Sequence, residues 1–459
     1  MNAGPIIRSV RLERSALLAL HAAYPRRYPA LFESAATSAF LGRYDILFAF
    51  PGARLTLDGS NVLTCEEPLP ELNGFLGALD TWWKRERDRA AHAASLPFRG
   101  GWLLFLGYEL AGHIETRLRL PQPHNGPIAQ AVRIPAAVIF QHESEEAWIV
   151  VEEAHSTLVA QIEADLATIT AAAPAPQTLL LGAVIEEPAE KYLHAIARAL
   201  DYIAAGDIYQ ANLSRAWCAR LAAGVQPHHV YRRLRQTNPG PFCALAVLDE
   251  LAVVSSSPER LVQVREGWIA TRPIAGTRPR GGDVRADREL ARELHTNAKE
   301  RAEHIMLIDL ERNDLGRVCA AGSVEVDEFM TVESYAHVHH IVSNVRGRLR
   351  PDTTPGQVLA AVFPGGTITG CPKVRCMEII AELENEARGA YTGSLGYLNR
   401  DGDMDLNILI RSLEIRGDEL SLRAGAGIVA DSLPERELEE TRAKAQGVLR
   451  ALSQESAPT

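Results

Sequence analysis

The sequence predicts an α+β fold, because its expected strands follow one another directly instead of alternating regularly with helices. Two such runs are present, at 244–247 with 251–255 and at 394–398, 406–414 and 419–424. Short polar turns at 400–403 and 416–418 separate the late strands. Strands joined by such turns pair antiparallel, so the sequence favours antiparallel sheets over a parallel one.

The first part of the chain is expected to hold strands and two helices, followed by a linker. The expected strands are 45–50, 102–105 and 136–140, and the expected helices are 75–94 and 156–169. An Ala- and Pro-rich stretch at 171–177 then interrupts the pattern, as linkers do. We therefore expect an N-terminal region at 1–170, a linker at 171–180 and a larger C-terminal region at 181–455.

The periodicity of apolar residues predicts three helices after the linker. The first spans 189–204 and ends before Gly206, a residue type that commonly terminates helices. A long helix is expected at 287–310, and a final helix at 435–452.

Composition narrows the class of protein. The chain has 459 residues, of which 46% are hydrophobic and 23% charged, as in ordinary globular proteins. Its net charge of −10 argues against nucleic acid as a partner, so any basic pocket for an anion is built locally. The six cysteines form no Cys-x-x-Cys pair, and neither a signal peptide nor a membrane-length apolar run is recognisable. A cytoplasmic protein that does not enter membranes is expected.

The most informative segment is the Gly- and Thr-rich loop at 363–378. It leads through Pro372 into Lys373 and Arg375, after which an apolar pattern of helical spacing begins at Met377. Backbone N–H groups, hydroxyls and cations at the start of a helix are suited to hold a small anion. The motif of a Walker loop is absent. An ordinary Gly-rich turn before an amphipathic helix is the alternative.

Carboxylates recur at helical spacing in two places. Glu300 and Glu303 lie one turn apart, and Glu437, Glu440 and Lys444 share one face of the final helix. Two such faces are able to hold a hard divalent cation such as Mg²⁺, whose remaining ligands would be substrate oxygens. Solvated, lightly salt-bridged helix faces are the alternative.

Two further patterns are weaker. Strand alternation would place His337 and His339 on one face and His340 on the other, which gives too few ligands for zinc. We therefore expect only His340 to be functional. The segment 424–432 contains Gly425-Ala426-Gly427 without the third glycine of a dinucleotide motif.

In combination, these segments resemble the chorismate-utilising enzymes, the large subunits that aminate chorismate. The resemblance extends from about 190 to 452, and the stretches 31–34 and 100–109 are similar to the start of that family. The motifs that carry it, in chain order, are 257–260, 273–278, 302–304, 340–343, 363–378, 403–405, 410–412, 424–432 and 440–444.

The resemblance implies two large antiparallel sheets packed as a sandwich with helices outside, and a chorismate site in the catalytic region at 181–455. It implies that Glu303 and Glu440 bind Mg²⁺, with Glu300 and Glu437 in support, and that Glu259 is the general acid. His340 and Thr367 would lie beside the ring. The remaining substrate-binding residues it implies are Gly276, Thr277, Tyr391, Arg411, Gly425, Ala426, Gly427 and Lys444.

Two positions distinguish branches of the family. Gln210 stands where the water-adding branch has a lysine base, and glutamine cannot deprotonate water, so ammonia is the expected nucleophile. Ala275 stands where aminodeoxychorismate synthases often carry a lysine nucleophile and anthranilate synthases carry alanine. The stretch 206–214 is similar to the aminodeoxychorismate branch. We expect amination at C4, with anthranilate synthesis as the alternative.

Either reaction implies a partner. No cysteine lies in a glutaminase-like nucleophile motif, so a separate glutamine amidotransferase subunit is expected to supply ammonia. The segments 31–34 and 238–242 resemble a tryptophan pocket, and tryptophan is a possible ligand there. Two other hypotheses are a non-catalytic anion-binding regulatory subunit and a metal hydrolase that uses the histidines.

Overall fold

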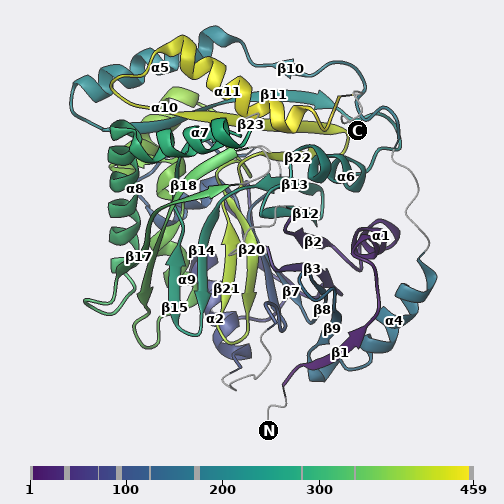
Figure 1. The fold of residues 1–459 in the computed structure, drawn as a ribbon. Coiled ribbons are helices and arrows are strands. Elements are labelled where there is room, and N and C mark those ends of the chain that lie inside the picture. The colour runs from purple at the N-terminus through teal and green to yellow at the C-terminus, as the bar shows by residue number, and fades with distance from the viewer. Residues whose placement is uncertain are drawn as a thin grey trace.

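Two antiparallel β-sheets form the centre of the computed structural model (Figure 1). The structure describes residues 4–35, 42–70, 72–88, 96–123, 126–169, 176–280, 283–334 and 338–453. The strands of the first sheet, in spatial order, are β1 (Ile6–Val10), β9 (Ala147–Val151), β8 (Ala136–Gln141), β3 (Tyr44–Ala49), β2 (Ala30–Glu33), β12 (Phe242–Leu248), β13 (Leu251–Ser257), β22 (Ser412–Arg416), β23 (Glu419–Ile428), β11 (Gln210–Arg220) and β10 (Ile185–Glu186), with β19 (Gly370–Cys371) paired to β11.

The second sheet has the same antiparallel pairing. Its strands, in spatial order, are β16 (Ile274–Pro279), β18 (Val338–Arg348), β15 (Trp268–Thr271), β14 (Arg260–Arg265), β21 (Met404–Asn407), β20 (Ser394–Asn399), β6 (Gly101–Leu106), β7 (Pro127–Ile134), β4 (Arg54–Asp58) and β5 (Leu63–Cys65), with β17 (Glu325–Ser334) paired to β18. Strands from both sides of the expected linker occur in both sheets. The division of the chain into two regions stays a prediction.

The helices lie outside the two sheets (Figure 1). They are α1 (Ser15–Ala23), α2 (Gly74–Glu86), α3 (Ala111–Ile114), α4 (Leu158–Thr168), α5 (Ala189–Ala204), α6 (Pro227–Thr237), α7 (Val284–Thr296), α8 (Ala298–Gly316), α9 (Pro355–Val362), α10 (Lys373–Glu384) and α11 (Pro434–Leu449). Three 3₁₀ turns are η1 (Tyr108–Leu110), η2 (Glu153–His155) and η3 (Gly366–Ile368). Within the described residues, no helix is long and apolar enough to cross a membrane.

Apolar side chains from the facing surfaces of the sheets form the central core. Phe48 of β3 and Phe105 of β6 belong to one buried cluster, which joins the two sheets. A second cluster packs α2 and α9 on the outer face of the second sheet, and a third packs α1, α6 and α11 on the first. The predicted α+β sandwich is therefore confirmed, with helices covering both outer faces.

The predicted helix at 287–310 is two helices. α7 ends at Thr296, and Asn297 has an extended backbone with ψ 114°. The Asn297 side chain accepts a hydrogen bond from the Glu300 amide at 3.1 Å, so it caps α8. Asparagine favours such caps over helix interiors because its side chain competes for backbone hydrogen bonds.

The predicted strand at 406–414 is also interrupted. β21 ends at Asn407 in the second sheet, and β22 begins at Ser412 in the first. The intervening residues carry the chain from one sheet to the other, and Arg411 adopts a left-handed backbone with φ 52°. Apolar periodicity cannot reveal this, because both strands are buried and read as one run.

Candidate active site

The site lies where the chain passes twice between the two sheets. β13 and β14 are joined through Glu259, and β21 and β22 are joined through Arg411. The two crossings are fastened to each other, because the Ile408 amide donates to the Glu259 carbonyl at 3.0 Å and the Ser256 amide donates to the Arg411 carbonyl at 3.1 Å. Backbone pairing therefore fixes the positions of Glu259 and Arg411.

Glu259 is a buried acid. Its side chain is 6% exposed and accepts a hydrogen bond from the Thr367 hydroxyl at 2.8 Å. Burial raises the pKa of Glu259 to about 8, the charge of Glu311 adds to this, and Arg411 opposes it. The carboxyl group is therefore protonated at neutral pH and able to donate a proton.

Arg411 is a buried cation that lacks a carboxylate partner among the described residues. Burial lowers its pKa, and Glu259 is the acidic group that faces it. The buried Arg388 and Arg423, in contrast, both pair with Glu384. A guanidinium group left unpaired beside a neutral acid is suited to bind a carboxylate.

Strands β16 and β18 bring four predicted residues together: Ala275, Gly276, Thr277 and His340. Ala275 pairs with Ile341 and Thr277 pairs with His340, with a register shift at Gly276 between them. A Cβ on Gly276 would lie 3.0 Å from Glu300 Oε2, and its φ of 64° also favours glycine. His340 Nδ1 lies 3.4 Å from the Gly276 carbonyl oxygen, and burial lowers the pKa of His340 to about 4. The imidazole is therefore neutral at physiological pH.

Of the other two histidines, the structure describes only His339. His339 is buried and contacts the Ser334 hydroxyl at 2.7 Å and Asp287 at 2.9 Å. His337 lies outside the described residues. The expectation that His340 alone has a role stays a prediction.

The predicted metal ligands lie on two helices that pack on different sheets. α8 packs against β16 and β18, and α11 packs against β23. Glu300 Oε1 accepts a hydrogen bond from Arg278 at 2.6 Å, while its buried Oε2 has no hydrogen-bond partner among the described residues. Glu303 follows one turn later. Among the residues that the structure describes, no three His, Cys, Asp or Glu side chains gather closely enough to hold a metal ion.

The predicted ligands on α11 are tied to the glycine strand. Glu440 pairs with Lys444 at 2.7 Å, and the Lys444 ammonium donates to the Gly425 carbonyl at 2.9 Å. Glu437 lies one turn before Glu440 on the same helix. The Lys444 ammonium is thus paired with Glu440 and hydrogen-bonded to the backbone of β23.

The glycines of β23 make room for side chains from neighbouring segments. A Cβ on Gly425 would lie 2.7 Å from the Tyr391 hydroxyl and 2.8 Å from Asn212 Oδ1. A Cβ on Gly427 would lie 2.7 Å from Gln210 Nε2, and Ala426 between them is buried. Gln210 and Asn212 come from β11, which pairs with β23.

Asn212 was not recognised in the sequence as a site residue. Its Oδ1 is buried and has no hydrogen-bond partner in the described structure. Asn212 Oδ1 is therefore a buried hydrogen-bond acceptor that is able to accept from a bound ligand. A single asparagine on a strand carries no periodic signal, so only the approach of its side chain to Gly425 reveals it.

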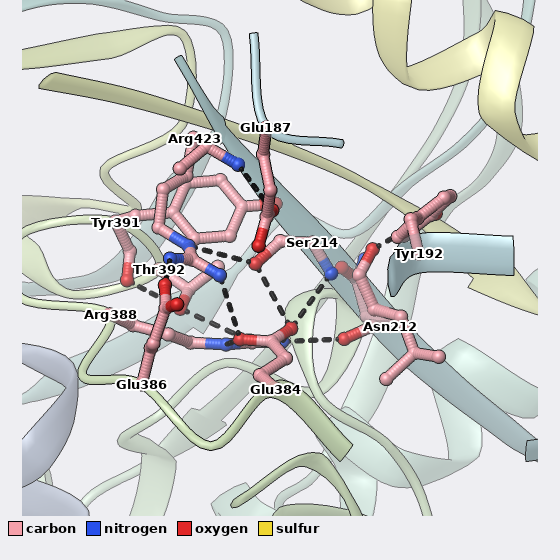
Figure 2. Close-up of polar contacts among 12 residues, drawn as sticks. Glu187, Tyr192, Asn212, Ser214, Glu384, Glu386, Arg388, Tyr391, Thr392 and Arg423 are labelled. Carbon is pink, nitrogen blue, oxygen red and sulfur yellow. Dashed lines mark hydrogen bonds and ion pairs between the residues drawn. The ribbon is translucent and has the colours of Figure 1, made fainter. Parts of the chain in front are cut away.

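A buried ion network holds the segment that carries Tyr391 (Figure 2). Arg388 donates to both oxygens of Glu384, at 2.6 and 3.0 Å, and to the Asn212 carbonyl at 2.6 Å. Glu384 also accepts from the Ser214 amide at 2.7 Å and pairs with Arg423 at 3.3 Å. The network links α10, β11 and β23. Arg388 and Glu384 lie four residues apart, but they were missed in the sequence because the groups that complete the network, on β11 and β23, are distant along the chain.

The side chains of the Gly- and Thr-rich loop have partners within the protein, and its use as an anion site stays a prediction. Thr367 donates to Glu259, and Thr369 donates to the Gly365 carbonyl at 2.9 Å. Lys373 pairs with Asp314, and Arg375 pairs with Glu378 at 3.1 Å. Through Thr367 the loop fixes the position of the Glu259 carboxyl group. The helix begins at Lys373, directly after Pro372.

A separate cavity of about 360 Å³ lies between the sheets. Its lining combines aromatic side chains with charged ones such as Arg260 and Asp405, and it includes Phe32, Ser34, Pro241, Phe242 and Tyr397. These residues include members of both segments that resemble a tryptophan pocket.

Comparisons with known proteins agree with this architecture. A family model described as chorismate binding enzyme matches residues 43–450. Aminodeoxychorismate synthase component 1 of Bacillus subtilis is 39% identical over 447 residues, covering 94% of this chain and 93% of the relative. An anthranilate synthase component I-like protein of Synechocystis is 44% identical over 361 residues, covering 78% and 73%. The crystal structure of anthranilate synthase component I from Streptococcus pneumoniae superposes with a TM-score of 0.78 at 32% identity, covering 90% and 93%.

We predict that Glu384→Gln destabilises the protein by about 3 kcal/mol, because it leaves the buried Arg388 without its anion and Arg423 with only the half-exposed Glu386. Urea unfolding followed by circular dichroism measures the change. Glu382→Gln, two residues earlier on an exposed face of α10, is the matched control and should change the free energy of unfolding by less than about 0.5 kcal/mol. Equal stability of the two variants would contradict a structural role for the network.

Proposed function

Because the chain belongs to the family of chorismate binding enzymes, we propose that it aminates chorismate at C4 to give 4-amino-4-deoxychorismate. The observation that carries the proposal is that a protonated Glu259 lies near Arg411. The Arg411 guanidinium has no carboxylate partner among the described residues. One group supplies a proton to a leaving oxygen, and the other binds a carboxylate of the substrate. A subunit that only binds anions would not need the buried acid.

The chemistry assigns one proton transfer to Glu259. Hydroxide is a poor leaving group, so the C4–O bond breaks with transfer of the Glu259 proton and water departs. A bond from the ammonia nitrogen to C4 replaces it, and the nitrogen then loses a proton. The neutral imidazole of His340 is suited to accept that proton or to orient the ring. Ala275 carries no nucleophile, so the enzyme forms no covalent bond to the ring from this position.

Mg²⁺ fits the donors that the helices present. Glu303 and Glu440 would hold it, with Glu300 and Glu437 in support, since carboxylate oxygens are the ligands it prefers. The buried Glu300 Oε2 that lacks a hydrogen-bond partner is consistent with a cation nearby. When bound, Mg²⁺ would neutralise the ring carboxylate and draw electron density from the ring. Mg²⁺ usually takes only one or two protein carboxylates, so a cluster of three is not required.

The choice of C4 over C2 rests on sequence similarity around the site. The relative named aminodeoxychorismate synthase matches nearly the whole of both chains, and the stretch 206–214 is similar to that branch. Anthranilate synthesis remains the second candidate, because Ala275 and several relatives favour it. In either reaction we propose that a glutamine amidotransferase subunit supplies the ammonia.

The direct test is to incubate the purified chain with chorismate, Mg²⁺ and ammonium and to separate the products by mass and fluorescence. We predict 4-amino-4-deoxychorismate, which an added lyase converts to 4-aminobenzoate, and no turnover after Mg²⁺ is chelated. Anthranilate as the direct product would overturn amination at C4. Turnover with glutamine, in contrast, should require an added glutaminase subunit.

We predict that kcat/KM for chorismate falls as the pH rises through about 8, because Glu259 then loses its proton. Free ammonia is kept constant across the pH series so that its own ionisation does not contribute. Glu259→Gln should lower kcat by about a hundredfold to ten-thousandfold and abolish this limb of the profile. Glu250→Gln, an exposed residue in a turn, is the control. A Glu259→Gln enzyme with normal turnover would remove Glu259 as the acid.

We also propose that the cavity between the sheets binds tryptophan. Its volume of about 360 Å³ and its aromatic lining suit an indole ring. L-Tryptophan should therefore raise the melting temperature in a concentration-dependent manner, because a ligand that binds only the folded state stabilises it. L-Phenylalanine at the same concentration is the control. Identical melting temperatures with and without L-tryptophan would contradict the proposal.

A further inference from the structure

A second buried carboxylate lies behind the proposed general acid. Glu311, on α8, is 6% exposed, and the Gly366 amide faces its side chain. A Cβ on Gly366 would lie 3.3 Å from Glu311 Oε1. The next residue, Thr367, donates to Glu259 at 2.8 Å. Consecutive residues of one turn thus contact the two carboxyl groups and hold them near each other.

The charges around the two carboxyl groups are few. Glu259 faces Glu311 and Arg411. Glu311 faces Asp314 and Lys373, which form an ion pair with each other, and Arg317 lies near Asp314. The charge of Lys373 is therefore largely offset by Asp314. The carboxylate of Glu311 is therefore the negative charge that acts on Glu259.

Two buried carboxyl groups this close do not both ionise readily, because the second charge would be repelled by the first. Burial raises the pKa of both, to about 8 for Glu259 and to about 7 for Glu311. The Lys373 ammonium and the Gly366 amide both favour the ionised form of Glu311, so Glu311 is the member of the pair that loses its proton first. The remaining proton then stays on Glu259.

On the basis of the proposed function, we propose that Glu311 is a positioning residue whose carboxylate keeps the proton on Glu259, so that Glu259 stays a general acid at and above neutral pH. Glu311 itself touches neither the substrate nor the reacting atoms in this scheme. It acts through the charge that it places behind Glu259. Neither composition nor helical periodicity singles it out, because it depends on the packing of α8 against the turn at Gly366.

The pH profile of kcat/KM tests this role. Glu311→Gln should move the alkaline limb to lower pH by about one unit, because the like charge that holds the proton is gone. Glu311→Asp retains the charge and should restore the alkaline limb toward its wild-type position even if kcat falls. Asp309→Asn removes an exposed carboxylate from the same helix and should leave the profile unchanged. A wild-type profile for Glu311→Gln would overturn the proposal.

Infrared difference spectra test the same point without turnover. The C=O stretch of a protonated carboxyl group, assigned to Glu259 by its loss in Glu259→Gln, should disappear at lower pH in Glu311→Gln than in the wild-type protein. Glu311→Leu is a second neutral variant in case Glu311→Gln does not fold. An unchanged titration of the Glu259 band would overturn the proposal. If the wild-type protein does not aminate chorismate, the proposed function fails, and the spectra still decide the role of Glu311.

Discussion

The proton on Glu259 is the constraint on which the rest of the candidate site depends. If this carboxyl group were ionised, it would be drawn to the Arg411 guanidinium beside it, and a buried ion pair would occupy the place of a substrate carboxylate. Burial prevents this by disfavouring the charged form of Glu259. The same burial thus provides an acid and leaves Arg411 available to an anion. The protonated Glu259 and the unpaired Arg411 therefore both result from burial at the same place.

The fold creates this environment by crossing between sheets at two adjacent points. A residue at such a crossing is covered by both sheets, but it belongs to no strand, so its side chain does not have to follow the alternation of either sheet. The left-handed backbone of Arg411, which costs on the order of 1 kcal/mol for a non-glycine residue, is tolerated because hydrogen bonds on both sides fix the crossing. The ion network around Glu384 likewise fixes the backbone on the side of the site formed by β11 and β23. It holds the segment that carries Tyr391 against these two strands.

The sequence predicted the fold class well, because antiparallel runs with polar turns leave a local pattern. It also identified Glu259, Arg411 and the glycines of β23, through motifs that resemble a known family. It did not reveal that Lys373 is paired with Asp314, or that Arg388 and Glu311 lie next to the site. Those facts depend on contacts between residues far apart in the chain. The break at Asn297 did leave a local signal, an asparagine followed by glutamate three residues later, which is typical of a helix start.

The residues that separate the branches of the family come from different sheets. Gln210 lies on β11 in the first sheet, and Ala275 lies on β16 in the second. Neither side chain can act as a base or as a nucleophile. This chain therefore has fewer reactive groups of its own than a relative with lysine at either position. Under the proposed function the attacking amine is external, and selection between C2 and C4 would then depend on where ammonia approaches the ring. The shape of the pocket and acceptors such as Asn212 Oδ1 would set that approach. An acceptor without a protein partner, beside Tyr391 and Gly425, is suited to orient an incoming N–H group, and this links the choice of carbon atom to the geometry of β11.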